Sequence, residues 1–105
     1  MEDEEVIDRI TKRVLQSADP VRLILFGSRA RGDAGADSDY DLMVVERDVT
    51  DRVAEMVRLS RRLRSLGVPI DLIVVTASAF DYWKDTPGNV YHEAATQGRS
   101  LYEAA

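Results

Sequence analysis

The chain has 105 residues and a formal net charge of −5, and it contains no cysteine. This length predicts one domain, and the lack of cysteine excludes disulfides, cysteine–zinc sites and thiol catalysis. The acidic balance argues against stable nucleic-acid binding, which depends largely on neutralising phosphates. The N-terminus is acidic, unlike that of a signal peptide, and no apolar run approaches the roughly 20 residues of a membrane span. We therefore expect a cytoplasmic protein without a membrane partner.

The first predicted element is an amphipathic helix over residues 4–17, which begins with acidic residues and ends before Pro20. Two apolar runs follow, over residues 23–26 and 42–45, and they predict strands over residues 22–26 and 40–46. Between them, Gly27-Ser28 predicts a turn that opens a short helix. The order is therefore strand, turn, short helix, loop and strand.

Gly27 and Ser28 are the first candidate site residues, although such a pair is most often a simple turn. Gly27 has no Cβ, so a phosphate can approach the backbone closely, and the N–H groups at a helix start favour an anion. Ser28 adds a hydroxyl donor, and Arg31 can hold a phosphate oxygen with its fork of donors. The segment predicts nucleotide binding by Gly27, Ser28 and Arg31, and it leaves Arg29 free to face solvent.

Asp39 and Asp41 stand at the head of the second strand, two residues apart, so their side chains point to the same side. Two like charges at this spacing favour either a proton on one of them or a cation between them. A hard divalent cation such as Mg²⁺ suits these oxygen ligands best. The alternative is a solvated loop end that uses aspartates as turn residues.

Asp71 interrupts an apolar run at residues 70–75 that reads as a buried strand. An isolated charge in such a strand is costly unless it is paired or bound to a metal. If this strand lies beside the strand of Asp41, three carboxylates converge in the outline of a two-metal site. The alternative is a salt bridge between Asp71 and a helix arginine.

Residues 51–66 predict a helix with Thr50 as N-cap and Gly67 after its end. One face of this helix is basic. It is either a solvated face or a surface that docks an acidic partner or guides nucleotide phosphates. Its arginines are Arg52, Arg58, Arg61, Arg62 and Arg64.

The last third of the chain predicts a short helix opened by Ser78, a turn at 86–89, a helix at 90–97 and an edge strand at 99–103. Its aromatic residues favour a core role over a wall for a nucleotide base. His92 is the only histidine, so no histidine dyad or triad is expected. The elements together predict an α/β fold with a small mixed sheet of three to five strands and helices mainly on one face.

Gly27-Ser28, ten residues and Asp39-x-Asp41 resemble the signature of the DNA polymerase β-like nucleotidyltransferase superfamily. Residues 27–32 and 38–42, Asp71 and the ending at 97–103 are similar to its smallest branch, the minimal nucleotidyltransferases (MNT). The resemblance covers roughly residues 23–102. It implies the polymerase β-like palm, an α+β variant of the predicted class, as a single minimal nucleotidyltransferase domain over residues 1–105.

The catalytic residues expected on this basis are Asp39, Asp41 and Asp71, which also serve as the metal ligands. Asp39 and Asp41 hold two Mg²⁺ ions and through them the triphosphate of ATP, and Asp71 holds the catalytic ion and takes the proton of the attacking hydroxyl. Gly27, Ser28 and Arg31 hold the β- and γ-phosphates.

The acceptor of the nucleotide is suggested only by the resemblance. The minimal branch resembles the antitoxin half of toxin–antitoxin pairs whose partner is a HEPN-domain ribonuclease, and this implies transfer of AMP from ATP to a tyrosine of that toxin. One alternative is a non-catalytic antitoxin that neutralises its partner by binding. Others are modification of an antibiotic hydroxyl, which needs an added pocket, and RNA tailing, which needs further domains.

Overall fold

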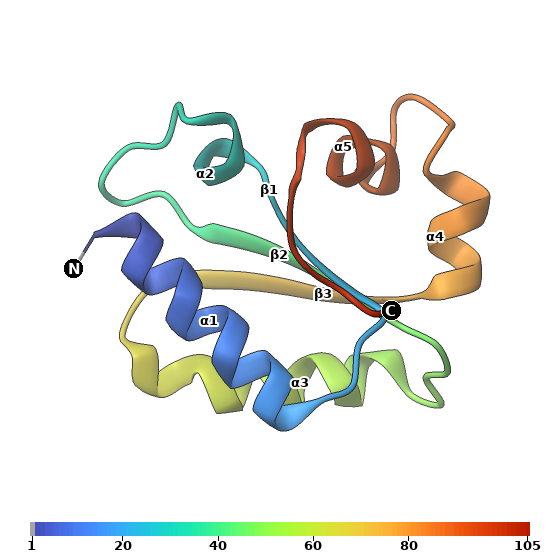
Figure 1. Ribbon diagram of the computed structural model, residues 1–105, viewed down its shortest axis with the longest axis horizontal. Helices are drawn as coiled ribbons and strands as arrows, with labels where there is room; N and C mark the ends of the chain where they lie inside the picture. The colour runs from blue at the N-terminus through green and yellow to red at the C-terminus, as the bar shows by residue number, and fades with distance from the viewer. Residues whose placement is uncertain (1) are drawn as a thin grey trace.

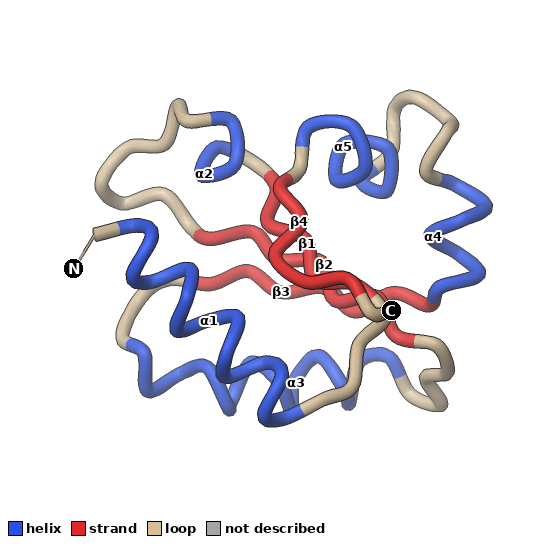
Figure 2. The backbone as a smooth tube through the Cα atoms, viewed as in Figure 1, coloured by secondary structure: helices blue, strands red, loops and turns tan. Residues whose placement is uncertain are grey.

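The computed structural model describes residues 2–105 and is built on a four-stranded sheet with strand order β3-β2-β1-β4 (Figure 1). Figure 2 shows β4 at one edge of this sheet, beside β1. The strands are β1 (Arg22–Phe26), β2 (Tyr40–Glu46), β3 (Ile70–Thr76) and β4 (Arg99–Glu103). The helices are α1 (Asp3–Ser17), α2 (Ser28–Arg31), α3 (Arg52–Leu63) with a 3₁₀ turn η1 (Arg64–Leu66), α4 (Ala77–Trp83) and α5 (Val90–Gln97).

The sheet is mixed, as the sequence predicted. Strand β1 pairs antiparallel with β2 and places Phe26 opposite Asp41, whereas β2 pairs parallel with β3 and places Asp41 opposite Asp71. The expectation that the strand of Asp71 lies beside that of Asp41 is confirmed. Because β2 lies between β1 and β3, it brings the end of the first strand and the start of the third to one place.

The helices cover both faces of the sheet, which corrects the expectation that they lie mainly on one. The long helices α1 and α3 cover one face, where Ile10 and Leu59 pack in a core with Leu42. The short helices α4 and α5 cover part of the other face, where Phe80 and Ala94 pack in a second core (Figure 1). Strand residues alternate between the two cores, because successive side chains point to opposite faces.

The N-cap residues of two helices differ from the prediction by one and by two residues. Asp51, and not Thr50, caps α3 by accepting a hydrogen bond from the Ala54 N–H at 3.0 Å. Thr76, and not Ser78, caps α4 by accepting from the Ala79 N–H at 3.1 Å, because α4 follows β3 without a connecting loop. In each case the side-chain oxygen lies three residues before the N–H that it accepts from, which is the usual N-cap geometry.

The basic face of α3 is partly used inside the fold. Arg58 donates to the Ser17 carbonyl at 2.7 Å, and Arg62 donates to the Ser17 hydroxyl at 3.1 Å. Both contacts tie α3 to the end of α1. Among residues 2–105, no helix is long and apolar enough to cross a membrane.

Candidate functional site

The candidate site lies where β1 ends and where β2 and β3 begin. Asp41 and Asp71 are register partners on adjacent strands, so their side chains point to the same face of the sheet, the face that α4 and α5 cover. Gly27 follows Phe26, whose strand partner is Asp41. The predicted cradle residue and two of the predicted carboxylates are therefore brought together by strand pairing alone.

Gly27 leaves space that the Asp41 carboxylate occupies. A Cβ built on Gly27 would collide with Oδ2 of Asp41, so only glycine allows this approach. Gly27 also has φ 73° and ψ −159°, a conformation that residues with a Cβ almost never adopt. Both the space and the backbone conformation require glycine at this position.

Helix α2 offers less to an anion than the sequence suggested, because it is a single turn. The N–H groups of Ala30 and Arg31 donate to the Gly27 carbonyl, each at 3.1 Å. The turn thus uses these donors itself, and a phosphate would be met by the N–H groups of Ser28 and Arg29 and by side chains. The helix dipole of one turn adds little.

Asp41 is half-buried and is surrounded by like charges. Burial raises the pKa of the Asp41 carboxyl above its ordinary value, and the negative charges of neighbouring carboxylates raise it further. These neighbours are Asp71, Asp39 and Glu93, and the guanidinium of Arg31 opposes them in part. An excess of negative charge on oxygen ligands is the condition under which a hard divalent cation binds.

Asp71 is exposed near the start of β3, whereas Leu72, Val74 and Val75 of the same strand are buried, as the sequence predicted. Among the ion pairs of residues 2–105, none joins Asp71 to a helix arginine, so the salt-bridge alternative is not the arrangement found. Asp39 is exposed just before β2 begins. Both carboxylates are open to solvent and so to a ligand.

The carboxylates do not form a closed metal cage. Over residues 2–105, no three aspartate, glutamate or histidine side chains lie close enough to hold one ion. This suits Mg²⁺, which is commonly bound by one or two carboxylates and completes its shell with water and substrate phosphates. The oxygen donors and the excess negative charge fit such an ion.

Arg31 lies at the edge of the site, and its side chain is 40% exposed. Its guanidinium forms ion pairs with Asp33 and Glu93, each at 3.4 Å. Beside it is a cavity of about 500 Å³ that is lined mainly by α5. Its volume is within the usual range for a small-molecule site. Glu93 was missed by sequence reasoning, because only the packing of α5 against the sheet brings it near Asp41.

The sequence left open whether Arg29 faces solvent, and in the structure it does not. Its side chain is only 10% exposed and donates hydrogen bonds to Asp3 and to the carbonyls of Ala36 and Ser38. Its guanidinium also lies 4.3 Å from the centre of the Tyr40 ring. Arg29 thus connects α2 with α1 and with the loop before Asp39.

The aromatic residues of the last third divide between core and surface. Phe80 is buried and Tyr91 packs against the same core, whereas Tyr82 and Trp83 are exposed. The Nδ1–H of His92 donates to the Lys84 carbonyl at 2.9 Å. This contact joins α5 to the end of α4, so His92 has a structural contact of its own.

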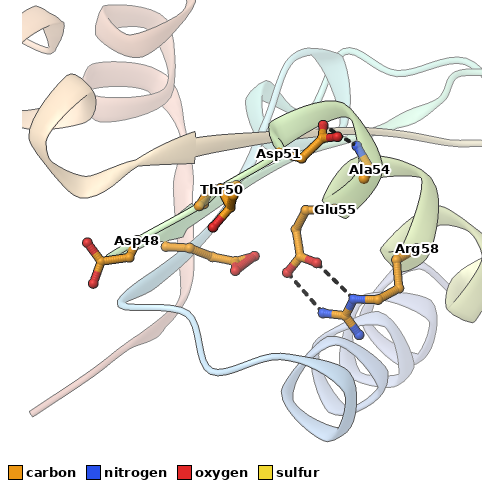
Figure 3. Close-up of a pocket in the computed structure, with 8 residues that line it drawn as sticks. Asp48, Thr50, Asp51, Ala54, Glu55 and Arg58 are labelled. Carbon is orange, nitrogen blue, oxygen red and sulfur yellow. Dashed lines mark hydrogen bonds and ion pairs between the residues drawn. The ribbon is translucent and has the colours of Figure 1, made fainter.

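A second cavity, of about 300 Å³, lies at the opposite end of β2 (Figure 3). It is lined by Glu46, Asp48, Glu55 and Arg58, among others. Figure 3 shows the Arg58 guanidinium facing the Glu55 carboxylate, to which it donates two hydrogen bonds at 2.8 and 2.9 Å. None of the predicted site residues lines this cavity.

Comparison with known proteins places the chain among nucleotide-transferring proteins. Residues 7–90 match the family model described as the nucleotidyltransferase domain. A protein of Methanocaldococcus jannaschii, which carries the provisional name protein adenylyltransferase, is 33% identical over 81 residues, or 77% of each chain.

Two solved structures resemble the whole fold. A chain of a toxin–antitoxin complex with AMP-PNP aligns with a TM-score of 0.69 and 22% identity, over 93% of this chain and 73% of its own length. A chain in the complex of tri-AMPylated Shewanella oneidensis HEPN toxin with MNT antitoxin aligns with a TM-score of 0.65 and 20% identity, over 98% and 74% of the two chains. At these identities the likeness establishes the fold, and the predicted palm is confirmed.

Proposed function

The chain belongs to the nucleotidyltransferase domain family, and from this membership we propose that it transfers AMP from ATP to a protein hydroxyl. The nucleotidyltransferase class follows from the family, and the protein acceptor is supported by the relative that carries the name protein adenylyltransferase. We extend the domain to residues 1–105, beyond the matched range of 7–90.

The observation that carries the proposal is the environment of Asp41. This half-buried carboxylate lies opposite Asp71, and Gly27 keeps the space on its other side free of a Cβ. When bound there, Mg²⁺ would neutralise the triphosphate and increase the acidity of the attacking hydroxyl. Asp39, Asp41 and Asp71 are the residues that would hold two such ions between them, because their oxygens and their excess charge suit hard cations.

The chain's own residues have separate tasks in the transfer. Gly27 and Ser28 line the approach of the phosphates, and Arg31 exchanges its carboxylate partners for phosphate oxygens. Asp71, which is exposed, accepts the proton of the acceptor hydroxyl. The hydroxyl oxygen then bonds to the α-phosphorus, the bond from the α-phosphorus to the bridging oxygen breaks, and pyrophosphate leaves.

We propose that the acceptor is a tyrosine of a HEPN-domain toxin and that the chain acts as its antitoxin. Two structures that share the fold come from toxin–antitoxin complexes, and in one of them the HEPN toxin carries AMP groups. A reaction that consumes ATP would take place in the cytoplasm.

The test is label transfer from ATP labelled at the α-phosphate, in extract of the source cells with Mg²⁺. The native chain is compared with a variant that carries Asp39→Asn and Asp41→Asn. A discrete labelled protein band with the native chain alone is the expected result, and mass spectrometry of that band identifies the modified residue. Label in RNA would instead indicate nucleotide tailing. No transfer, with a partner still co-purifying, would leave neutralisation by binding as the function.

A further inference from the structure

The loop between α2 and β2, residues 32–39, carries Asp39 and has few contacts of its own. Most of its side chains are exposed, and Ala34 and Ser38 are only half-buried. Inside the loop, the Gly35 N–H donates to the Ser38 hydroxyl at 2.9 Å and the Ser38 N–H donates to the Gly35 carbonyl at 3.2 Å. These two bonds shape a turn but do not attach it to the sheet.

Arg29 supplies that attachment. Its Nε and Nη2 both donate to the Ser38 carbonyl, at 3.2 and 2.8 Å, and Nη2 also donates to the Ala36 carbonyl at 3.3 Å. The Ser38 carbonyl belongs to the peptide group that leads into Asp39. Because a peptide group is planar, fixing this oxygen also fixes the N–H of Asp39 and limits where its carboxylate points.

Arg29 is itself held from the other side. Nη1 donates to Oδ1 of Asp3 at 2.9 Å, and the Tyr40 hydroxyl donates to the same oxygen at 2.7 Å. The Tyr40 ring lies against the guanidinium. These hydrogen bonds, first from Tyr40 and then from Arg29, hold the pKa of Asp3 below its ordinary value. The guanidinium of Arg29 therefore joins three elements: helix α2, the first turn of helix α1 and the start of strand β2.

The contacts leave Arg29 little capacity to bind a phosphate. Four of its five N–H groups are directed at protein oxygens, and nine-tenths of its side chain is buried. Arg31, two residues later, is the exposed one of the pair. The two arginines of the motif thus differ in their surroundings: Arg29 is held inside the fold, and Arg31 is partly exposed beside Asp33 and Glu93.

We propose that Arg29 is a positioning residue that fixes Asp39 for cation binding, with Asp3 and Tyr40 as its support. This inference rests on the proposed function, since it assigns Asp39 to the metal. Arginine suits the position because one planar fork reaches the Ser38 carbonyl with two donors and Asp3 with a third. A lysine presents a single ammonium and cannot reproduce this geometry.

The test substitutes Arg29→Lys and uses Arg99→Lys as the matched control. Arg99 also forms an ion pair with the first turn of α1, through Glu4, but it does not contact the loop. In Arg29→Lys, we expect hydrogen exchange of the Gly35 and Ser38 amides to accelerate at least about tenfold. The Mg²⁺ concentration for half-maximal AMP transfer should rise about tenfold, and the rate at saturating Mg²⁺ should stay within about threefold of the native rate. Arg99→Lys should change none of the three.

Tyr40→Phe serves as a second variant, because it removes one hydrogen bond to Asp3 and keeps the ring. It should shift exchange and Mg²⁺ dependence in the same direction by a smaller factor. Unchanged exchange in Arg29→Lys, or a slower rate that excess Mg²⁺ does not restore, would overturn the positioning role. If the native chain transfers no AMP, the proposed function fails, and the exchange measurement still decides whether Arg29 fixes the loop.

Discussion

Strand β2 has a carboxylate near each end, Asp41 at its start and Glu46 at its finish, and the two lie on opposite faces of the sheet. Near Glu46, the neighbouring carboxylate of Glu55 is neutralised by two hydrogen bonds from Arg58. Burial, followed by a hydrogen bond with Glu55, raises the pKa of Glu46 to about 7. The raised pKa of Glu46 and the guanidinium of Arg58 thus both reduce the negative charge at this end.

The start of β2 is balanced differently. Asp41 has Asp71, Asp39 and Glu93 around it, and Arg31 is shared between Glu93 and Asp33. The protein's own cations therefore leave negative charge at this end, and the exposed positions of Asp39 and Asp71 allow an external cation to reach it. Carboxylates that the fold neutralises itself therefore have a structural role, whereas carboxylates left with excess charge mark a ligand site.

The largest effect that tests this comparison is on catalysis. Asp41→Asn removes a proposed metal ligand and should lower the rate of AMP transfer at least about 100-fold. Glu46→Gln, the matched amide substitution at the other end of the same strand, should leave the rate within about twofold. Steady-state label transfer at saturating Mg²⁺ and ATP measures both. Equal losses in the two variants would mean that the ends of β2 do not differ in function.

Gly27→Ala tests the space beside Asp41. The new Cβ would collide with Oδ2 of Asp41. The alanine would also have to adopt a backbone conformation almost restricted to glycine, which costs roughly 1–3 kcal/mol of folding free energy. Most of the AMP transfer should be lost as well.

Gly32→Ala is the control for Gly27→Ala. Gly32 also has a positive φ, of 85°, but a Cβ there meets no atom within 4 Å. The free energy of unfolding of this variant, measured by urea denaturation, should be about 1 kcal/mol lower than that of the native chain. The variant should keep most of its transfer activity. If the two alanine variants behave alike, backbone strain alone would explain the glycines, and the space beside Asp41 would have no role.

The pH dependence of stability tests the other end of β2. The folded-state pKa of Glu46 is raised to about 7. The contribution of Glu46 to the stability of the fold is therefore fully present at a pH below the ordinary glutamate pKa, and it is lost as the pH rises through about 7. Glu46→Gln should therefore be more stable than the native chain at pH 8 by about 1 kcal/mol, an amount reduced by partial exposure, and this advantage should vanish near pH 5. Thermal unfolding at several pH values measures the difference.

Glu55→Gln should behave in the opposite way. The hydrogen bonds from Arg58 lower the pKa of Glu55, so its contribution is present above its ordinary pKa and is lost as the pH falls through the lowered folded-state value. The variant should be less stable than the native chain at pH 8. Loss of stability at pH 8 in both variants would show that Glu46 is ionised and paired, contrary to the account.

The smallest effect concerns the stability of the site without metal. The pKa of Asp41 is raised, so its ionised form opposes folding at neutral pH. Without Mg²⁺, Asp41→Asn should have a slightly higher Tm than the native chain at pH 7.5. Addition of Mg²⁺ and AMP-PNP should raise the Tm of the native chain and leave the variant unchanged. A lower Tm for Asp41→Asn without metal would mean that the carboxylate is already compensated.

Most of the strands and the motif could be predicted from local patterns. The segments at 22–26 and 40–46 are mainly apolar and are bounded by turn residues. The bounds of β1 and β2, and the position of Gly27 directly after β1, could therefore be predicted. The predicted contact between the strands of Asp41 and Asp71 was also correct. These features depend on residues close in sequence or on one strand pairing.

Other features depend on packing that the sequence does not display. Strand β3 is largely buried, as its apolar run predicts, yet Asp71 near its start is exposed, which the run does not display. Arg29 has the same charge as Arg31 in the motif, and only its contacts in the folded chain show that it serves the fold; they join it to Asp3, Ala36, Ser38 and Tyr40. Glu93 approaches Asp41 through the packing of α5.

The central claim, that the start of β2 is kept negative for a metal-bound nucleotide, is tested most directly by calorimetric titration with AMP-PNP. The native chain and Glu46→Gln should bind the nucleotide with Mg²⁺ and lose at least about tenfold in affinity when EDTA replaces the metal. Asp41→Asn should bind weakly in both conditions. Equal binding with and without Mg²⁺ in the native chain, or undiminished binding by Asp41→Asn, would contradict the account.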